Sequence, residues 1–158
     1  MKHRTRLIVL IVFILLAVAY GAAGWYFSSL IIASDTETLA EAAAEAEADN
    51  ETPADFGLPE PEVISINTGQ VTLAGWYFDN PTDGDCGLMF LHGFHGTRYH
   101  ALNWAPIFWK RGCDILAYDH RGHGDSTPAF HTYGYYEKED AIAALDWFTD
   151  RSGLERSQ

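Results

Sequence analysis

Charge is missing from one long stretch of this 158-residue chain, and positive charge is missing from the next. Residues 7–34 contain no charged side chain, and residues 35–62 contain ten acidic residues but no Lys or Arg. Residues 63–158 have twelve acidic against seven basic residues and no basic patch, which argues against a nucleic-acid-binding protein. No internal repeat is present either, so the chain is not a repeat array.

The uncharged stretch is mostly apolar and predicts a transmembrane helix over residues 7–34. At about 1.5 Å per residue it is long enough to cross a hydrocarbon core of roughly 30 Å. A basic tail over residues 1–6 precedes it and acidic residues follow it. We therefore expect a signal anchor of a single-pass membrane protein, with the amino terminus in the cytoplasm and the following domain periplasmic or otherwise extracytoplasmic.

The alternative to an anchor is a signal peptide that is cleaved after small residues such as Ala19 or Gly24. Cleavage at either place would leave an apolar stub, which includes Trp25 and Ile31, on a soluble protein. The length of the apolar run therefore favours the anchor.

The acidic segment over residues 35–62 is rich in Ala, Glu and Pro and predicts a linker. Leu39 to Ala48 alternates Ala with Glu without an apolar face, and repulsion between the glutamates weakens any helix that it forms. The sequence thus predicts a solvated spacer between the membrane and residues 63–158. A site for a basic partner or a cation is the alternative.

Residues 63–158 alternate between strand and helix patterns, which is typical of α/β folds. Two strands joined by a tight turn are predicted over residues 63–66 and 71–78. Short apolar runs at 88–91 and 115–118 predict buried strands, with a helix between them within residues 99–111. An amphipathic helix is predicted over residues 137–151, with Gly153 as its cap.

Each of the two short apolar runs is followed by a glycine-rich turn. The first turn reads His-Gly-Phe-His-Gly over residues 92–96, and the second reads Asp-His-Arg-Gly-His-Gly-Asp-Ser over residues 119–126. Because ligands bind outside the carboxyl ends of parallel strands, these turns are where we expect the chemistry of the protein.

The two turns resemble the HG-x-x-G and D-x-R-G-x-G-x-S motifs of the α/β-hydrolase superfamily, of the serine esterase, lipase and aminopeptidase type. Residues 134–140, with the pattern G-x-x-E-x-x-D, are similar to esterase and peptidase relatives. The resemblance covers residues 63–158. It implies the amino-terminal portion of a mostly parallel sheet with helices on both faces. Epoxide hydrolases and dehalogenases are less similar, because His95 stands where they have proline.

The resemblance also implies a serine hydrolase that acts on an ester, thioester or amide of a small molecule or peptide, without a cofactor or metal. It assigns the backbone N–H of Phe94 as a donor to the oxyanion of the acyl-transfer intermediate. Residues of the two turns support this site: His92, Gly93, Gly96, Asp119, Arg121, Gly122, Gly124 and Ser126.

The catalytic serine itself is not found in these 158 residues. Ser126 follows Gly124 as in the nucleophile motif G-x-S-x-G, but Pro128 occupies the last glycine position, and the motif occurs nowhere else. We therefore expect the nucleophile, acid and base beyond Gln158, and we expect this fragment alone to be inactive.

Two functions from other classes stay open at this point. One is a non-catalytic exported binding module on a hydrolase-like scaffold. The other is a zinc hydrolase, since five histidines lie in or near the turns, although no H-E-x-x-H or H-x-H-x-D-H motif is present. These histidines are His92, His95, His100, His120 and His123.

Cys86 and Cys113 lie at equal distances before the two turns, six residues ahead of His92 and Asp119. On neighbouring parallel strands, equal offsets would place the two cysteines side by side, about 5 Å apart. In an exported protein that distance permits a disulfide. Two buried free thiols are the alternative.

Overall fold

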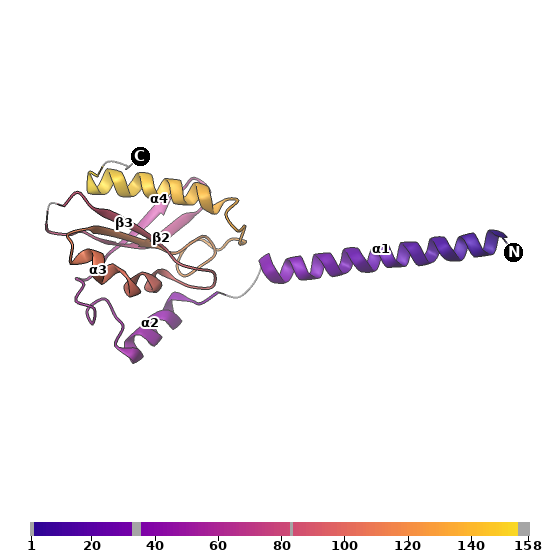
Figure 1. Cartoon of the computed structure of the whole chain (residues 1–158), viewed down its shortest axis with the longest axis horizontal. Coiled ribbons are helices and arrows are strands. Elements are labelled where there is room, and N and C mark those ends of the chain that lie inside the picture. Colours follow the sequence, from indigo (N-terminus) through magenta and orange to yellow (C-terminus); the bar gives the residue numbers. More distant parts are fainter. Residues whose placement is uncertain (1, 33–35, 83, 155–158) are drawn as a thin grey trace. The chain divides into compact units, whose positions relative to one another are not determined.

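The computed structural model of the chain describes residues 2–32, 36–82 and 84–154. The chain divides into two compact units, Met1–Ser34 and Asp35–Gln158. The first unit is one helix, α1 (Lys2–Ile32), shown in Figure 1. Over His3–Ile32 this helix is long and apolar enough to cross a membrane. The last two residues of the predicted transmembrane segment, Ala33 and Ser34, lie outside the described residues.

The second unit is built on a four-stranded sheet with the order β1-β2-β4-β3. The predicted hairpin is formed by β1 (Glu62–Asn67) and β2 (Thr72–Phe78), and β2 also pairs antiparallel with β4 (Asp114–Tyr118). Only β3 (Gly87–Leu91) runs parallel to its neighbour among the described strands. The expected mostly parallel sheet is therefore wrong, and the sheet is mixed. A tight turn joins antiparallel strands, and only β3 and β4 are linked by a helical crossover.

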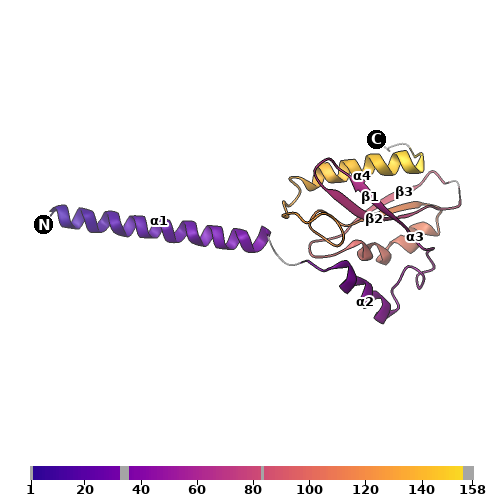
Figure 2. The same cartoon turned by 180° about the vertical axis from the view of Figure 1, so that it is seen from behind.

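Helices lie on both faces of the sheet, as Figures 1 and 2 show. On one face, α4 (Glu137–Ser152) packs Phe148 against Tyr77 and Leu116. On the other face, η1 (Arg98–Asn103) and α3 (Ala105–Trp109) pack against Ile115 and its neighbours. The single helix predicted within residues 99–111 is thus split in two. Pro106 lies in the first turn of α3, where a residue without an N–H is tolerated.

The acidic segment, predicted as a linker over residues 35–62, is grouped with residues 63–158 in the second unit. Its first part forms α2 (Leu39–Asp49), which begins with a capping box between Thr38 and Glu41 and packs against η1. Ala42 and Ala46, which lie one helical turn apart, are both buried. These alanines form a narrow apolar face that allows a highly charged helix to pack, and the sequence prediction overlooked it.

Candidate active site

The two glycine-rich turns are neighbours at the carboxyl ends of β3 and β4, whose last residues, Leu91 and Tyr118, pair with each other. His92 joins the turns. Its Nε2 accepts a hydrogen bond from the His120 N–H at 2.9 Å, and its Nδ1 donates to the Gly93 carbonyl oxygen at 2.7 Å. Burial lowers the pKa of His92 to about 3, so the ring is neutral near pH 7. His92 therefore holds the neighbouring loop.

In the first turn, Phe94 is exposed at the surface. The Phe94 side chain is 46% exposed, and within residues 36–82 and 84–154 no group accepts a hydrogen bond from its backbone N–H. His95 follows with φ at 67°, in the left-handed region. A Cβ at Gly96 would collide with the His100 ring, so the turn is tight there. The Phe94 N–H is consequently available to a ligand.

In the second turn, the Asp119 carboxylate is already bonded to the protein, whereas His120 Nδ1 and His123 Nε2 are buried without a partner among the described residues. Asp119 is fully buried, and its Oδ1 accepts a hydrogen bond from the Arg98 N–H at 2.7 Å. Its Oδ2 accepts one from the Asp125 N–H at 3.1 Å. Burial raises the pKa of Asp119, and the nearby Arg98 guanidinium opposes this rise. A Cβ at Gly124, where φ is 49°, would collide with the Asp119 carboxylate, so only glycine fits.

Ser126 ties this turn to the sheet. Its Oγ donates a hydrogen bond to the Asp119 carbonyl oxygen at 2.6 Å and accepts one from the Ala74 N–H of β2 at 2.9 Å. The residue is only 5% exposed. Both the donor and an acceptor site of the hydroxyl are thus occupied by bonds within the protein.

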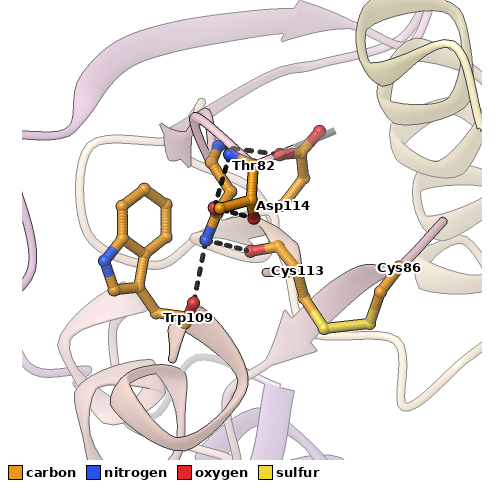
Figure 3. Close-up of a disulfide and its surroundings, with 6 residues drawn as sticks. Thr82, Cys86, Trp109, Cys113 and Asp114 are labelled. Atoms are coloured by element: carbon orange, nitrogen blue, oxygen red, sulfur yellow. Dashed lines mark hydrogen bonds between the residues drawn. A yellow bond between two sulfur atoms is a disulfide. The ribbon is translucent and has the colours of Figure 1, made fainter. Parts of the chain in front are cut away.

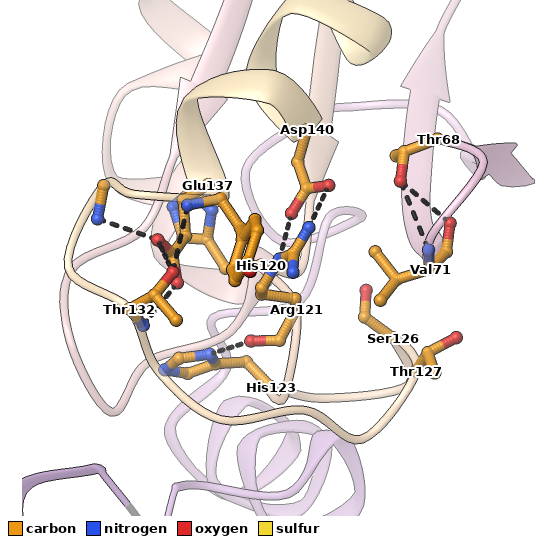
Figure 4. A network of polar contacts seen from close by, with 12 residues as sticks. Thr68, Val71, His120, Arg121, His123, Ser126, Thr127, Thr132, Glu137 and Asp140 are labelled. Carbon is orange, nitrogen blue, oxygen red and sulfur yellow. Dashed lines mark hydrogen bonds and ion pairs between the residues drawn. The ribbon is translucent and has the colours of Figure 1, made fainter.

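Arg121 anchors the second turn to α4, as Figure 4 shows. Its Nε and Nη2 donate to the two carboxylate oxygens of Asp140 at 2.6 and 2.8 Å, and both side chains are buried. The guanidinium also lies over the Tyr136 ring at 4.9 Å. Next to it, Gly122 has φ at 72°, and a Cβ there would collide with the Ala129 carbonyl oxygen.

A pocket of about 210 Å³ opens between the two turns and the segment that leads into α4. Burial raises the pKa of Glu137, but hydrogen bonds from the Thr132 hydroxyl and N–H and from the Gly134 N–H outweigh it and lower the pKa to about 2. This ionised carboxylate fixes the segment in place. The pocket is lined by His92, Gly93, Phe94, His120, His123, His131, Tyr133, Gly134 and Glu137.

The histidines of this pocket are packed against one another. The rings of His123 and His131 stack at 4.4 Å, and burial lowers the pKa of both His120 and His123. Across the part of the chain that the structure describes, no group of three or more His, Cys, Asp or Glu residues is arranged to hold a metal ion.

A disulfide joins Cys86 and Cys113 just before the two strands that carry the turns (Figure 3). Their Cα atoms are 4.5 Å apart, and the adjacent pair Gly87 and Asp114 are partners in the parallel register. The equal offsets noted in the sequence thus place the two cysteines side by side. The bond fixes the amino-terminal ends of β3 and β4 to each other.

Several residues of the site were missed by the sequence prediction. Arg98 is fully buried between Asp119 and Asp125, and nothing in its local pattern distinguishes it from a surface arginine. His131 and Tyr133 line the pocket from a segment without a motif. Glu137 and Asp140 lie in the G-x-x-E-x-x-D pattern, which could have indicated their role.

Comparison with known proteins shows which proteins this chain resembles. The family model for the alpha/beta hydrolase fold matches residues 88–156. The protein YqkD of Bacillus subtilis is 32% identical over 81 residues, which are 49% of this chain and 27% of that protein. The lysophosphatidylserine lipase ABHD12 of Mus musculus is 33% identical over 82 residues, which are 49% of this chain and 20% of the lipase.

Among solved structures, an esterase of Pyrococcus furiosus, Pf2001, superposes with a TM-score of 0.58 and 32% identity, over 66% of this chain and 41% of the esterase. The chain therefore spans less than half the length of each of these relatives. Its two turn motifs, its strand order and these similarities show that the chain belongs to the α/β-hydrolase superfamily and carries part of that fold.

Proposed function

We propose that this chain is the amino-terminal part of a membrane-anchored, exported serine hydrolase that cleaves an ester, thioester or amide through an acyl-enzyme. The observation that carries the proposal is the Phe94 N–H, which lies beside an open pocket at the end of β3 without an acceptor among the described residues. In this superfamily the same turn supplies an oxyanion donor. The names of two similar proteins, a lipase and an esterase, support acyl chemistry.

In the proposed reaction, a serine oxygen attacks the carbonyl carbon of the substrate, and the carbonyl π electrons move onto its oxygen. The Phe94 N–H and the N–H that follows the serine donate hydrogen bonds to that oxyanion. A histidine, oriented by an acid, takes the serine proton and gives it to the leaving group as the oxyanion collapses and the bond between the carbonyl carbon and the leaving group breaks. Water, deprotonated by the same histidine, then attacks the acyl-serine, and the serine leaves with the proton returned to it. We place the serine, acid and histidine beyond Gln158, because these 158 residues contain no G-x-S-x-G motif and span only part of their relatives.

The residues of this chain then serve to hold the donor in place. His92 is neutral and bridges the turns, so it holds the Gly93 carbonyl group next to Phe94 without adding charge near the oxyanion. Asp119 and Arg121 fix the second turn against which the first one rests. A donor held rigidly before the reaction needs no reorganisation as charge develops, and this preorganisation is the source of its catalytic effect.

Labelling with a fluorophosphonate probe, which reacts with activated serines, tests this function. The gene is expressed from codon 1 through its downstream sequence, and the 158-residue chain is prepared alongside it. We expect the longer protein to be labelled at a serine within G-x-S-x-G and the 158-residue chain to remain unlabelled. A folded longer protein without such a serine and without labelling would contradict the proposal and favour a non-catalytic binding module.

A further inference from the structure

The beginning of the acidic segment contacts both glycine-rich turns. The Glu37 N–H donates a hydrogen bond to the His95 carbonyl oxygen at 3.1 Å, and the Thr36 hydroxyl donates one to the Gly122 carbonyl oxygen at 3.3 Å. The Glu37 carboxylate accepts a hydrogen bond from the Thr97 hydroxyl at 3.4 Å. These residues all belong to the second unit, so the contacts are independent of the position of α1. The start of the acidic segment therefore forms a second link between the two turns, in addition to the histidine bridge.

Residues 36 and 37 are themselves held by the helix that follows them. Thr38 is the N-cap of α2, and its N–H donates a hydrogen bond to the Glu41 carboxylate at 2.9 Å, which completes the capping box. Farther along this helix, Ala42 and Ala46 are buried, and α2 packs against η1, the short helix that follows the first turn. The start of the acidic segment is thus fixed to the part of the unit that carries the first turn.

The turn over residues 92–96 contains one residue in an unfavourable backbone conformation. The Gly96 N–H donates a hydrogen bond to the Gly93 carbonyl oxygen at 3.2 Å and closes a four-residue turn. His95, the third residue of this turn, has φ at 67°, a conformation that glycine adopts more readily than residues with a side chain. Such a conformation persists where neighbouring groups hold it. The hydrogen bond from the Glu37 N–H to the His95 carbonyl oxygen is a contact of this kind.

The direction of the Phe94 N–H depends on the closure of this turn. The Phe94 N–H and the Gly93 carbonyl group belong to one peptide group, which is planar. The Gly93 carbonyl oxygen accepts hydrogen bonds from the Gly96 N–H and from His92 Nδ1. A change in the backbone conformation of His95 would open the bond between Gly93 and Gly96 and so turn the Phe94 N–H. Displacement of a catalytic group by about 1 Å can slow a reaction by about a hundredfold.

We infer that Thr36 and Glu37 are positioning residues of the candidate active site. The Glu37 N–H holds His95 in its left-handed conformation and thereby keeps the Phe94 N–H in place beside the pocket. The Thr36 hydroxyl links the same segment to the second turn. The start of the acidic segment then supports catalysis, in addition to any role as a spacer. The effect on catalysis rests on the proposed function, whereas the effect on the turn does not.

Two substitutions at residue 37 isolate the backbone N–H. Glu37→Ala and Glu37→Pro both remove the carboxylate, but only proline also removes the N–H. Residue 37 precedes Thr38, the N-cap of α2, so proline does not interrupt that helix. Glu60→Pro is the control for an added proline in the acidic segment, since Glu60 is exposed and its N–H has no acceptor among the described residues. Thr36→Val and Thr36→Ser form a second pair, because valine removes the hydroxyl and serine retains it.

Turnover of the water-soluble ester p-nitrophenyl butyrate by the longer gene product measures the catalytic effect. We expect kcat of Glu37→Pro to be about tenfold lower than that of Glu37→Ala, with KM within about twofold, because an oxyanion donor acts in the transition state. Glu60→Pro should retain the kcat of the unsubstituted protein, and melting temperatures check the folding of each variant. If Glu37→Pro does not fold, the Thr36 pair replaces it, with a lower kcat expected for valine than for serine. Equal kcat values within the pair that is used would overturn the catalytic role.

Hydrogen exchange in the same variants tests the effect on the turn without any catalysis. Because the Gly96 N–H closes the turn, we expect its exchange to be several-fold faster in Glu37→Pro than in Glu37→Ala, or in Thr36→Val than in Thr36→Ser. Equal exchange within the pair would overturn the role of this segment in holding the turn. Faster exchange together with equal kcat would overturn the catalytic role alone. No hydrolysis by the unsubstituted protein would overturn the proposed function and leave the result on the turn standing.

Discussion

The two glycine-rich turns share composition and position but differ in what their polar groups already bind. In the turn over residues 92–96, the Phe94 N–H has no acceptor within the described residues and its ring is half exposed. In the turn over residues 119–126, the Asp119 carboxylate and the Ser126 hydroxyl are buried and bonded inside the protein. A reactive residue type in a motif is therefore a catalytic candidate only if the fold has left its hydrogen-bonding capacity unused.

Disrupting the turn over residues 119–126 should have the largest effect on stability. Arg121→Ala leaves the buried Asp140 carboxylate without its partner, and we expect the free energy of unfolding to fall by about 3–5 kcal/mol. Urea unfolding of the chain in nanodiscs, followed by tryptophan fluorescence, measures the loss.

Arg151→Ala is the matched control for this prediction. Arg151 pairs with Glu62 at 2.8 Å, but both side chains are about half exposed, so water screens the pair and we expect a much smaller loss. Equal losses for the two arginine variants would contradict the view that the second turn is held by a buried ion pair.

Removing the disulfide deletes the covalent link between the segments that lead into β3 and β4. The bond links residues 27 apart, and for a loop of this size the chain-entropy estimate of its contribution is about 3–4 kcal/mol. We expect Cys86→Ser with Cys113→Ser to lower the free energy of unfolding by that amount. Intact mass after alkylation, with and without prior reduction, checks the bond directly, because identical labelling in the two samples would show free thiols.

His92→Ala removes the side chain that joins the turn over residues 92–96 to the turn over residues 119–126. The His120 N–H then loses its acceptor, and a cost of about 1 kcal/mol follows, at the low end for an unsatisfied donor because the site is partly buried. His100→Ala, at an exposed position on η1, is the control and should change stability little. If both variants unfold at the same urea concentration, the bridge between the turns does not contribute to stability.

Low pH should weaken the contact between the two turns through His92, His120 and His123. Burial lowers the pKa of His92 to about 3, and it also lowers those of His120 and His123. Below pH 6.5 the unfolded chain therefore takes up protons that the native state does not, and stability falls as the pH falls. The limit is about 1.4 kcal/mol per pH unit for each histidine.

The measurement for this prediction is urea unfolding between pH 7 and pH 4.5, the range above the ordinary pKa of carboxylates. His92→Gln should reduce the slope of the unfolding free energy against pH by up to the contribution of one proton, which is about 1.4 kcal/mol per pH unit. If the unfolding free energy of the unsubstituted chain does not depend on pH in this range, these histidines take up protons in the folded state as they do in the unfolded state.

The regular elements and the positions of the turns could be predicted from the sequence, because they depend on local patterns. The short apolar runs that became β3 and β4 and the cap at Gly153 are of this kind. The packing of α2 could not be predicted, since burial of Ala42 and Ala46 depends on a partner surface, η1, distant in sequence. Arg98 was missed for the same reason, because its two carboxylate partners, Asp119 and Asp125, lie in the turn over residues 119–126.

The most direct test of the account is the turnover rate of the longer gene product when the Phe94 N–H alone is removed. Phe94→Pro and Phe94→Ala both delete the ring, but only proline also deletes the N–H. We expect kcat of the proline variant to be about 10²–10³-fold lower than that of the alanine variant, with equal melting temperatures. Equal kcat values for the two variants would contradict the claim that the turn over residues 92–96 supplies an oxyanion donor.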